Sequence, residues 1–401
     1  MSLISSRQPY RMEKSEIITW CDEVFLFIKK VSREFLKPQL KYDEHKSIRE
    51  RQLCVDALYE LIQLVRDFDD RTKFLGYYAH LVTFCQKVSL SPSSFVIKLP
   101  TLSAREPIET GASAQVLHGH HNNQEVAVKR FRLYARTIPR IRQRFLKESS
   151  ILQLLQHPNV VPFIGVVSEG SRLCIVSPWM KNGDIIAFIK KSPNVSRKEL
   201  IEQVADGLHF LSGYNIVHGD LKGANVLIND AEKACISDFG IASIQDHAEP
   251  PSLSELNPHG QQTLLRKCKD ALKHGGLSVT FASSLSSRMS SFSGAGTYRW
   301  MAPERLIPEA LDIPSAKPTF ASDVFSLAML AIEVYSGDVP FGREKTQYAA
   351  FLMTIAGKRP PRPPGIPDPV WRLIEDCWAP QPVHRPDIWD VYNRLACIPD
   401  P

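Results

Sequence analysis

Two short stretches of this chain carry side chains that suit chemistry on phosphate groups. The first reads HGDLKGAN and contains Asp220, Lys222 and Asn225; the second reads SDFG and contains Asp238. A carboxylate can accept a proton from a hydroxyl, an ammonium group neutralises phosphoryl charge, and carboxylate and amide oxygens are ligands that Mg²⁺ prefers. The structural alternative is a hairpin in which Asp, Asn and Gly only form turns. The two stretches together favour phosphoryl transfer.

Further motifs stand before and after these two. The sequence VAVK reads as a strand that ends at Lys129, and Glu148 lies within an apolar pattern of helical spacing. Pro158 is expected to end that helix, and a strand is expected to open at about Val160. Downstream, residues 296–304 read GTYRWMAPE, residues 323–326 read DVFS, and residues 384–386 read HRP.

These motifs resemble those of the eukaryotic protein kinase family, over residues 99–398, about three quarters of the chain. Lys222 and Thr297 are typical of serine/threonine kinases. The pairs Trp300-Met301 and Cys377-Trp378 are similar to the tyrosine-kinase-like branch of those enzymes. Gly219, where arginine is usual, also resembles kinases of basidiomycete fungi.

The resemblance implies a catalytic set and a metal-binding set. Asp220 is the expected proton acceptor and Lys222 the lysine that neutralises the transferring phosphoryl group. Lys129, paired with Glu148, is expected to contact the α- and β-phosphates of ATP. The expected ligands of Mg²⁺ are Asn225 and Asp238. A further pair, Glu304 with Arg385, is expected to be largely buried.

The resemblance also implies how ATP is held. The adenine edge is expected to bond the backbone at Pro178 and Met180, and Pro178 can serve because only its carbonyl is needed. Residues 109–116, ETGASAQV, align with the glycine-rich loop but keep one of its glycines, so a weaker hold on the phosphates is expected. The predicted ATP contacts are Gly111, Val116, Ala127, Lys129, Pro178, Met180 and Leu227.

The implied fold class is α+β: a bilobal kinase domain with a β-rich small lobe over about 99–178 and a mainly helical large lobe over about 181–398. A helical extension is expected over residues 1–95, because apolar residues repeat at helical spacing over 55–65 and again over 75–85. Two interpretations stay open for it. It is either an extension packed on the small lobe or an independent interaction module.

The segment from Asp238 to Glu304 is much longer than an ordinary connection. Residues 246–285 are interpreted as an insert, either functional or derived from retained intron sequence. Residues 264–272 are predicted to form a short helix, and 283–293 are rich in serine. Gly219 removes the arginine that an activation-segment phosphate usually neutralises, so phosphate-dependent ordering of the catalytic aspartate is not expected.

Composition fits an ordinary globular protein, with 43% hydrophobic and 23% charged residues and a net charge of +6. Residues 129–147 contain eight Lys or Arg and no Asp or Glu. This basic stretch is interpreted as a solvated face, with an acidic or phosphorylated partner as the functional alternative; nucleic acid is not expected. The eight cysteines form no Cys-x-x-Cys pair, and no secretory signal or membrane-spanning run is visible. These features predict a cytoplasmic or nuclear protein.

The sequence therefore predicts an ATP- and Mg²⁺-dependent serine/threonine kinase that acts on protein hydroxyls in intracellular signal transduction. A pseudokinase scaffold of the same fold is the alternative. A small-molecule kinase is disfavoured by the Ala302-Pro303-Glu304 segment and by Arg385.

Overall fold

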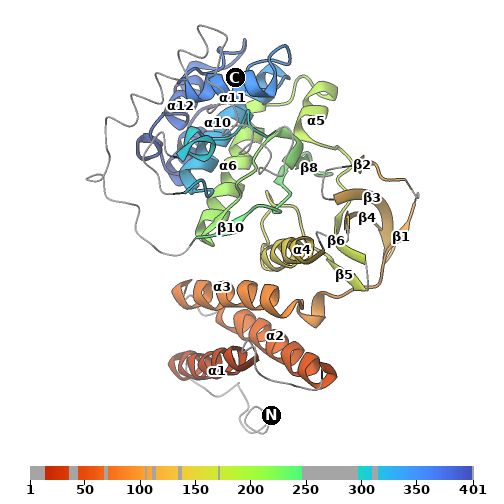
Figure 1. Ribbon diagram of the computed structural model, residues 1–401. Helices are drawn as coiled ribbons and strands as arrows, with labels where there is room; N and C mark the ends of the chain where they lie inside the picture. The colour runs from red at the N-terminus through yellow and green to blue at the C-terminus, as the bar shows by residue number, and fades with distance from the viewer. Residues whose placement is uncertain are drawn as a thin grey trace, which may run out of the picture. The chain divides into compact units, whose positions relative to one another are not determined.

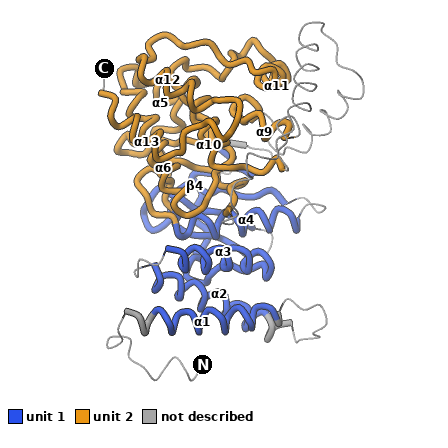
Figure 2. Tube along the Cα trace, turned by 90° about the vertical axis from the view of Figure 1, so that its left-hand side faces the viewer, with its two compact units in different colours: residues 1–109, 113–154, 163–177 blue, residues 110–112, 155–162, 178–401 orange. Residues whose placement is uncertain are grey.

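The protein divides into two compact units, coloured separately in Figure 2. Unit 1 contains residues 1–109, 113–154 and 163–177, and unit 2 contains residues 110–112, 155–162 and 178–401. The computed structural model describes residues 14–35, 44–66, 71–103, 106–110, 114–133, 138–169, 172–245, 297–308 and 315–399. The predicted contact Gly111, the insert 246–285 with its predicted helix, and the serine-rich stretch 283–293 lie outside these residues.

Unit 1 begins with helices α1 (Lys14–Phe35), α2 (Glu44–Arg66) and α3 (Arg71–Val88). The two apolar repeats in the sequence fall in α2 and α3, while α1 was not singled out. The helices lie in successive layers, and α3 also lies beside α4 (Ile138–Leu152), as Figures 1 and 2 show. Each inner helix therefore buries more than one side, which explains why Val55, Leu58 and Tyr78 are fully enclosed.

The contact between α3 and α4 joins the extension to the rest of unit 1. Tyr78 and Leu81 of α3 are fully buried, and the Tyr78 hydroxyl donates to the carbonyl of Ile151 on α4, at 3.1 Å. Ser93 lies in the connection between α3 and the sheet. Asp56 of α2 accepts hydrogen bonds from the backbone N–H and the hydroxyl of Ser93, at 2.7 and 2.8 Å. The helical extension thus packs on α4 inside the same compact unit.

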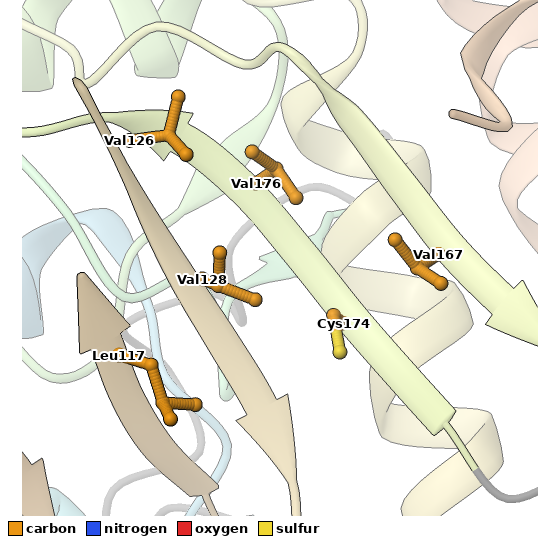
Figure 3. Packing of buried hydrophobic residues seen from close by; sticks show 6 residues of the cluster. All are labelled: Leu117, Val126, Val128, Val167, Cys174 and Val176. Atoms are coloured by element: carbon orange, nitrogen blue, oxygen red, sulfur yellow. The ribbon is translucent and has the colours of Figure 1, made fainter. Parts of the chain in front are cut away.

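The sheet of unit 1 has strands β1 (Thr101–Leu102), β2 (Glu109–Thr110), β3 (Ala114–His121), β4 (Gln124–Phe131), β5 (Gly165–Glu169) and β6 (Arg172–Pro178). Its order is β1-β3-β4-β6-β5, with β2 paired to β3. Asn122 and Asn123 join β3 to β4 with φ of 49° and 62°, left-handed values that asparagine tolerates in tight hairpins. Leu117, Val126, Val128, Val167, Cys174 and Val176 form the core cluster of the sheet (Figure 3).

Both predicted boundaries near Pro158 were wrong. Helix α4 ends at Leu152, before the proline, and the next strand begins at Gly165 instead of Val160. The reason is the set of partners that the backbone hydrogen bonds of this segment have. Around Val160 the chain pairs with Ile236: the Val161 N–H donates to the Ile236 carbonyl, and Ile236 N–H donates to the Asn159 carbonyl, both at 2.9 Å.

Unit 2 is mainly helical. Its helices are α5 (Ile185–Lys191), α6 (Arg197–Gly213), α9 (Pro303–Leu306), α10 (Phe320–Ser336), α11 (Gln347–Ile355), α12 (Asp368–Cys377) and α13 (Ile388–Ala396). The sequence of α10 is apolar almost all round, as expected of a central helix, and its residues 322–334 are all buried. No described helix of the chain combines the length and the hydropathy needed to cross a membrane.

Four short strands of unit 2 form two small antiparallel sheets. One pairs β7 (Ile216–Val217) with β10 (Ser243–Ile244), and the other pairs β8 (Val226–Ile228) with β9 (Ala234–Ile236). Asp220 and Lys222 lie in the connection from β7 to β8, and Asp238 lies just after β9. These strands therefore fix both ends of each segment that the sequence singled out.

Candidate active site

The connection from β7 to β8, residues 218–225, is held by the central helix. Asp323 of α10 accepts from the backbone N–H groups of His218 and Gly219, at 2.7 and 2.8 Å. Burial raises the pKa of Asp323, and the nearby His218 and the two N–H donors oppose that shift. A buried carboxylate satisfied by backbone donors is costly to displace, so Asp323 fixes the start of this loop.

A second acidic side chain of α10 fixes the middle of the loop. Glu333 accepts from the backbone N–H of Gly223 and from the indole N–H of Trp300, both at 2.8 Å. Burial raises its pKa to about 7, because no lysine or arginine bonds the carboxyl and the donors it receives are neutral. Since Trp300 belongs to the GTYRWMAPE segment, Glu333 ties that segment and the loop to one helix.

The side chains inside the loop converge on Asp220. The Lys222 ammonium donates to Asp220 Oδ2 at 2.9 Å and to the Thr297 hydroxyl at 3.1 Å. The Asn225 amide donates to the Asp220 carbonyl at 2.7 Å and to Oδ2 at 3.0 Å. Asp220 is only partly buried. The carboxylate is thus oriented from two sides while it remains accessible to a substrate hydroxyl.

The predicted metal ligands come together through the β8–β9 hairpin. Val226 pairs with Ile236 in the register of the two strands, so Asn225 and Asp238 flank the same end of the hairpin. Ser237 donates to the Asn225 carbonyl from its N–H at 2.8 Å and from its hydroxyl at 3.0 Å. Asp238 has a φ of 59°, a left-handed conformation that aspartate tolerates. One amide oxygen and one carboxylate fit the oxygen ligands that Mg²⁺ prefers.

In unit 1, Lys129 of β4 contacts Glu148 of α4. The Lys129 ammonium lies 2.5 Å from Glu148 Oε1; the Glu148 side chain is 2% exposed and the Lys129 side chain 20%. Apolar packing supports the pair, because Phe131 of β4 meets Phe145 of α4 edge to face at 5.6 Å. The expected Lys129–Glu148 contact is therefore present.

The predicted nucleotide contacts of unit 1 share one face of the β3–β4 hairpin. Val116 pairs directly with Lys129, and Ala127 pairs with His118, in the register of the two strands. Side chains two residues apart lie on the same face, so Val116, Ala127 and Lys129 point away from the core cluster that contains Leu117 and Val128. All three are partly exposed.

The predicted contacts of unit 2 lie around the end of β6. Pro178 is its last residue and is partly exposed, while Met180 is buried in a small cluster with Val161 and Cys235. Leu227 of β8 packs against the same cluster. The structure therefore brings Met180 and Leu227 together.

The pair predicted between Glu304 and Arg385 is confirmed. Arg385 donates from Nη1 to Glu304 Oε1 at 2.6 Å and from Nη2 to Oε2 at 2.8 Å. Its remaining donors meet the carbonyls of Ala379, Ala321 and Pro380, at 2.9, 2.9 and 3.3 Å. The pair joins α9 to the turn before α13.

Sequence reasoning did not assign three residues that build this site. Glu333 is the one acidic residue after Asp323 in an otherwise apolar helix, FASDVFSLAMLAIEVYS, and that isolation was a usable signal. Asp323 was noted only as part of the DVFS motif. Arg305, whose guanidinium donates to the Gly219 carbonyl, carried no signal in the sequence.

Known proteins are similar to this chain over the segments described above. The family described as protein tyrosine and serine/threonine kinase matches residues 102–256 and 273–395. Serine/threonine-protein kinase STY17 of Arabidopsis thaliana is 26% identical over 85% of this chain and 53% of its own length. Serine/threonine/tyrosine-protein kinase HT1 of the same plant is 26% identical over 71% of the chain and 63% of its own length.

A human relative agrees with the plant proteins. Mitogen-activated protein kinase kinase kinase 10 is 28% identical over 74% of this chain and 28% of its own length. The chain spans between about half and two thirds of the length of the first two relatives. The family match covers well over half of the chain and contains the segments built around Lys129, Asp220 and Glu304. The chain belongs to the protein kinase family, in its tyrosine-kinase-like branch.

Proposed function

We propose that this protein is an ATP- and Mg²⁺-dependent protein serine/threonine kinase. The observation that carries the proposal is the loop at Asp220, whose carboxylate is oriented by Lys222 and Asn225 and whose backbone is anchored to α10 by Asp323 and Glu333. Such pre-organisation lowers the barrier of a reaction in which the oriented group takes part. The relatives named as serine/threonine kinases support the same reaction.

Each side chain then has a defined task. Asp220 orients the substrate hydroxyl and accepts its proton, because its carboxylate is accessible and held from two sides. Lys222, already bonded to Asp220, carries a positive charge to the transferring phosphoryl group. Lys129, oriented by Glu148, binds the α- and β-phosphates.

The cofactor and nucleotide proposals rest on donor chemistry. Asn225 and Asp238 would hold Mg²⁺, which neutralises charge on the ATP phosphates when it is bound. Val116, Ala127 and Leu227 offer apolar surface to the adenine ring, and the backbone at Pro178 and Met180 offers it hydrogen bonds. Protein substrates with serine or threonine acceptors are proposed because Lys222 and Thr297 are typical of serine/threonine kinases, and these two side chains are in contact at 3.1 Å.

The experiment is a phosphotransfer assay with Mg²⁺ and labelled ATP, followed by identification of the phosphorylated amino acid. The wild type is expected to label serine or threonine. Asp220→Asn is expected to abolish transfer and to retain nucleotide binding, because the base acts on the hydroxyl and not on ATP. Binding of ATP without any transfer by the wild type would favour the pseudokinase alternative.

Two further proposals concern context. A cytoplasmic or nuclear location is proposed from the cysteine pattern given above, and a role in signal transduction from the membership of the protein kinase family. An acidic or phosphorylated partner at residues 129–147 stays a prediction: Lys129 is engaged by Glu148, and Arg130 donates to the Gln115 side chain at 3.1 Å. Any such partner would therefore meet the α4 part of the basic stretch.

A further inference from the structure

An arginine at the position before the catalytic aspartate would be strained in this fold. Gly219 has a φ of 79°, which L side chains rarely adopt. A Cβ there would lie 2.9 Å from Pro318 Cγ, closer than real Cβ atoms come to their neighbours. The glycine is thus required by the local backbone and by the proline beside it, and the loop has no cation of its own at this position.

A cation reaches the same place from another element. Arg305, the residue after Glu304 on α9, donates from Nη1 to the Gly219 carbonyl. Its side chain is buried, and burial lowers the pKa of its guanidinium while the charges of Asp323, Asp220 and Glu304 oppose that shift. Arg305 therefore lies in the field of the catalytic carboxylate as well as in contact with the loop.

The contact between Arg305 and the Gly219 carbonyl holds the peptide group that joins Gly219 to Asp220. The carbonyl of Gly219 and the N–H of Asp220 belong to the same planar unit. Arg305 holds the carbonyl, and the Asp220 N–H donates to His218 Nδ1 at 3.3 Å. With both polar atoms bonded, rotation of this peptide would cost two hydrogen bonds, one of them charge-assisted. The direction in which Asp220 leaves the backbone is thereby set.

We propose that Arg305 is a positioning residue for Asp220, a buried cation of α9 that orders the catalytic loop without an arginine at position 219 and without an activation-segment phosphate. The proposal rests on the proposed kinase function and goes beyond it, because it assigns the control of loop order to a residue of α9. Arg305 is itself held in place, since the neighbouring Glu304 is bonded twice by Arg385.

A matched control lies in the same segment. Arg299 is also a buried arginine whose guanidinium donates to backbone carbonyls, those of Pro340 at 2.7 Å and Gly342 at 3.1 Å. These partners and the third, the Lys345 carbonyl, lie outside residues 218–225. Arg299→Met removes the same chemistry from unit 2 without touching the loop, so it reports what a buried arginine contributes to stability alone.

The test compares Arg305→Met, Arg305→Lys and Arg299→Met with the wild type. Arg305→Met is expected to lower kcat about 100-fold with little change in the KM for ATP, because misplacement of a reacting group costs about this much. Arg305→Lys should recover most of the loss, since it keeps a charge and a donor. Phosphatase treatment of the wild type should leave its rate unchanged. Arg299→Met should lower Tm and leave kcat near the wild-type value.

A second readout does not depend on activity. Hydrogen exchange of the Asp220 amide, followed by mass spectrometry on a peptide covering residues 218–222, should speed up in Arg305→Met and not in Arg299→Met. An unchanged kcat and unchanged exchange in Arg305→Met would overturn the proposal, as would equal losses of kcat in both methionine variants or inactivation by phosphatase. If Arg305→Met does not fold, Arg305→Gln and Arg305→Lys carry the same comparison. If the wild type shows no phosphotransfer, and its Asp220 amide exchanges slowly but faster in Arg305→Met, the result counts against the kinase function alone. The role of Arg305 in ordering the loop would then stand.

Discussion

Two ion pairs in this protein look alike in the sequence and differ in the structure. Arg385 and Glu304 in unit 2 share two hydrogen bonds, and their side chains are 0% and 4% exposed. Lys129 and Glu148 in unit 1 share one contact, and the lysine side chain keeps 20% exposure. The first pair uses the planar fork of arginine and is closed to other partners, whereas the lysine of the second is a point charge with donors that can reach a ligand. The difference separates a pair that joins elements from a pair that presents a cation.

Glu333 adds a third kind of buried carboxyl to this comparison. It receives two neutral donors, from Gly223 and Trp300, and its pKa is raised to about 7. Glu304 and Glu148 are each paired with a cation. Glu333 therefore combines burial with neutral donors, which explains why its pKa is raised.

The largest expected effect comes from the Lys129–Glu148 pair, whose lysine is partly exposed. Lys129→Met should lower kcat/KM by about 100- to 1,000-fold, because a cation proposed to bind phosphate is lost. The Tm should also fall, because Glu148 is left buried without this cation, but it should fall less than in Arg385→Ala, where several hydrogen bonds are lost with the charge. Steady-state kinetics and thermal melting of one preparation measure both. Arg130→Met, which alters the neighbouring cation of β4, is the control. A fall in Tm as large as that of Arg385→Ala, together with an unchanged kcat/KM, would show that Lys129 with Glu148 is a structural pair like Arg385 with Glu304.

The fully buried pair, Arg385 with Glu304, should show its main effect in stability. Arg385→Ala strands Glu304 and leaves several carbonyls without donors, so it should reduce the free energy of unfolding by about 3–5 kcal/mol. Denaturant titration measures the loss. Arg385→Lys should lose less, because it keeps the charge and gives up the two-point geometry. A stability equal to that of the wild type in Arg385→Ala would remove the distinction between the pairs.

The Glu333 carboxyl predicts a pH dependence of stability. Its folded pKa of about 7 lies above the ordinary value of 4.5, so between these values the folded state binds the extra proton. The contribution of Glu333 to the free energy of unfolding is therefore fully present below pH 4.5. It is lost as the pH rises through 7, by on the order of 3 kcal/mol. Unfolding free energies at pH 5 and pH 8 should differ less in Glu333→Gln than in the wild type. A wild-type slope retained in that variant would assign the titration to another group.

The smallest effect tests whether α3 supports the Lys129–Glu148 pair through α4. Tyr78 donates to Ile151 of α4, whereas its neighbour Tyr77 donates to Asp22 of α1, at 2.5 Å. Tyr78→Phe and Tyr77→Phe should each cost about 1 kcal/mol in stability. Only Tyr78→Phe is expected to reduce kcat as well, because only that bond ends on the helix of Glu148. Equal kinetics for the two variants would make the extension a neutral addition to unit 1.

Much of the site was predictable because it depends on local spacing. Asp220, Lys222 and Asn225 lie within one loop, and their types and spacing are read directly from the sequence. The helix boundary near Pro158 was not predictable in this way. It was decided by hydrogen bonds between Asn159, Val161 and Ile236, residues about 75 positions apart in the chain.

The same contrast holds for the extension and for the acidic anchors. The spacing over 55–65 and 75–85 predicted helices but left open what they pack against. The answer depends on Tyr78 meeting Ile151, a contact between residues 73 positions apart. Asp323 and Glu333 contact loop residues more than 100 positions away, so no local pattern points to their partners.

By itself the sequence determined the family, the α+β class and which side chains stand in the catalytic loop, because motif spacing and apolar periodicity are local properties of the chain. Only the tertiary structure decided how those side chains are held. It set Gly219 at a positive φ against Pro318 and brought the Arg305 guanidinium to the carbonyl beside Asp220. The physical reason is that a buried polar atom needs a hydrogen-bond partner, and these partners come from distant segments of the chain. Such segments meet only when the chain has folded.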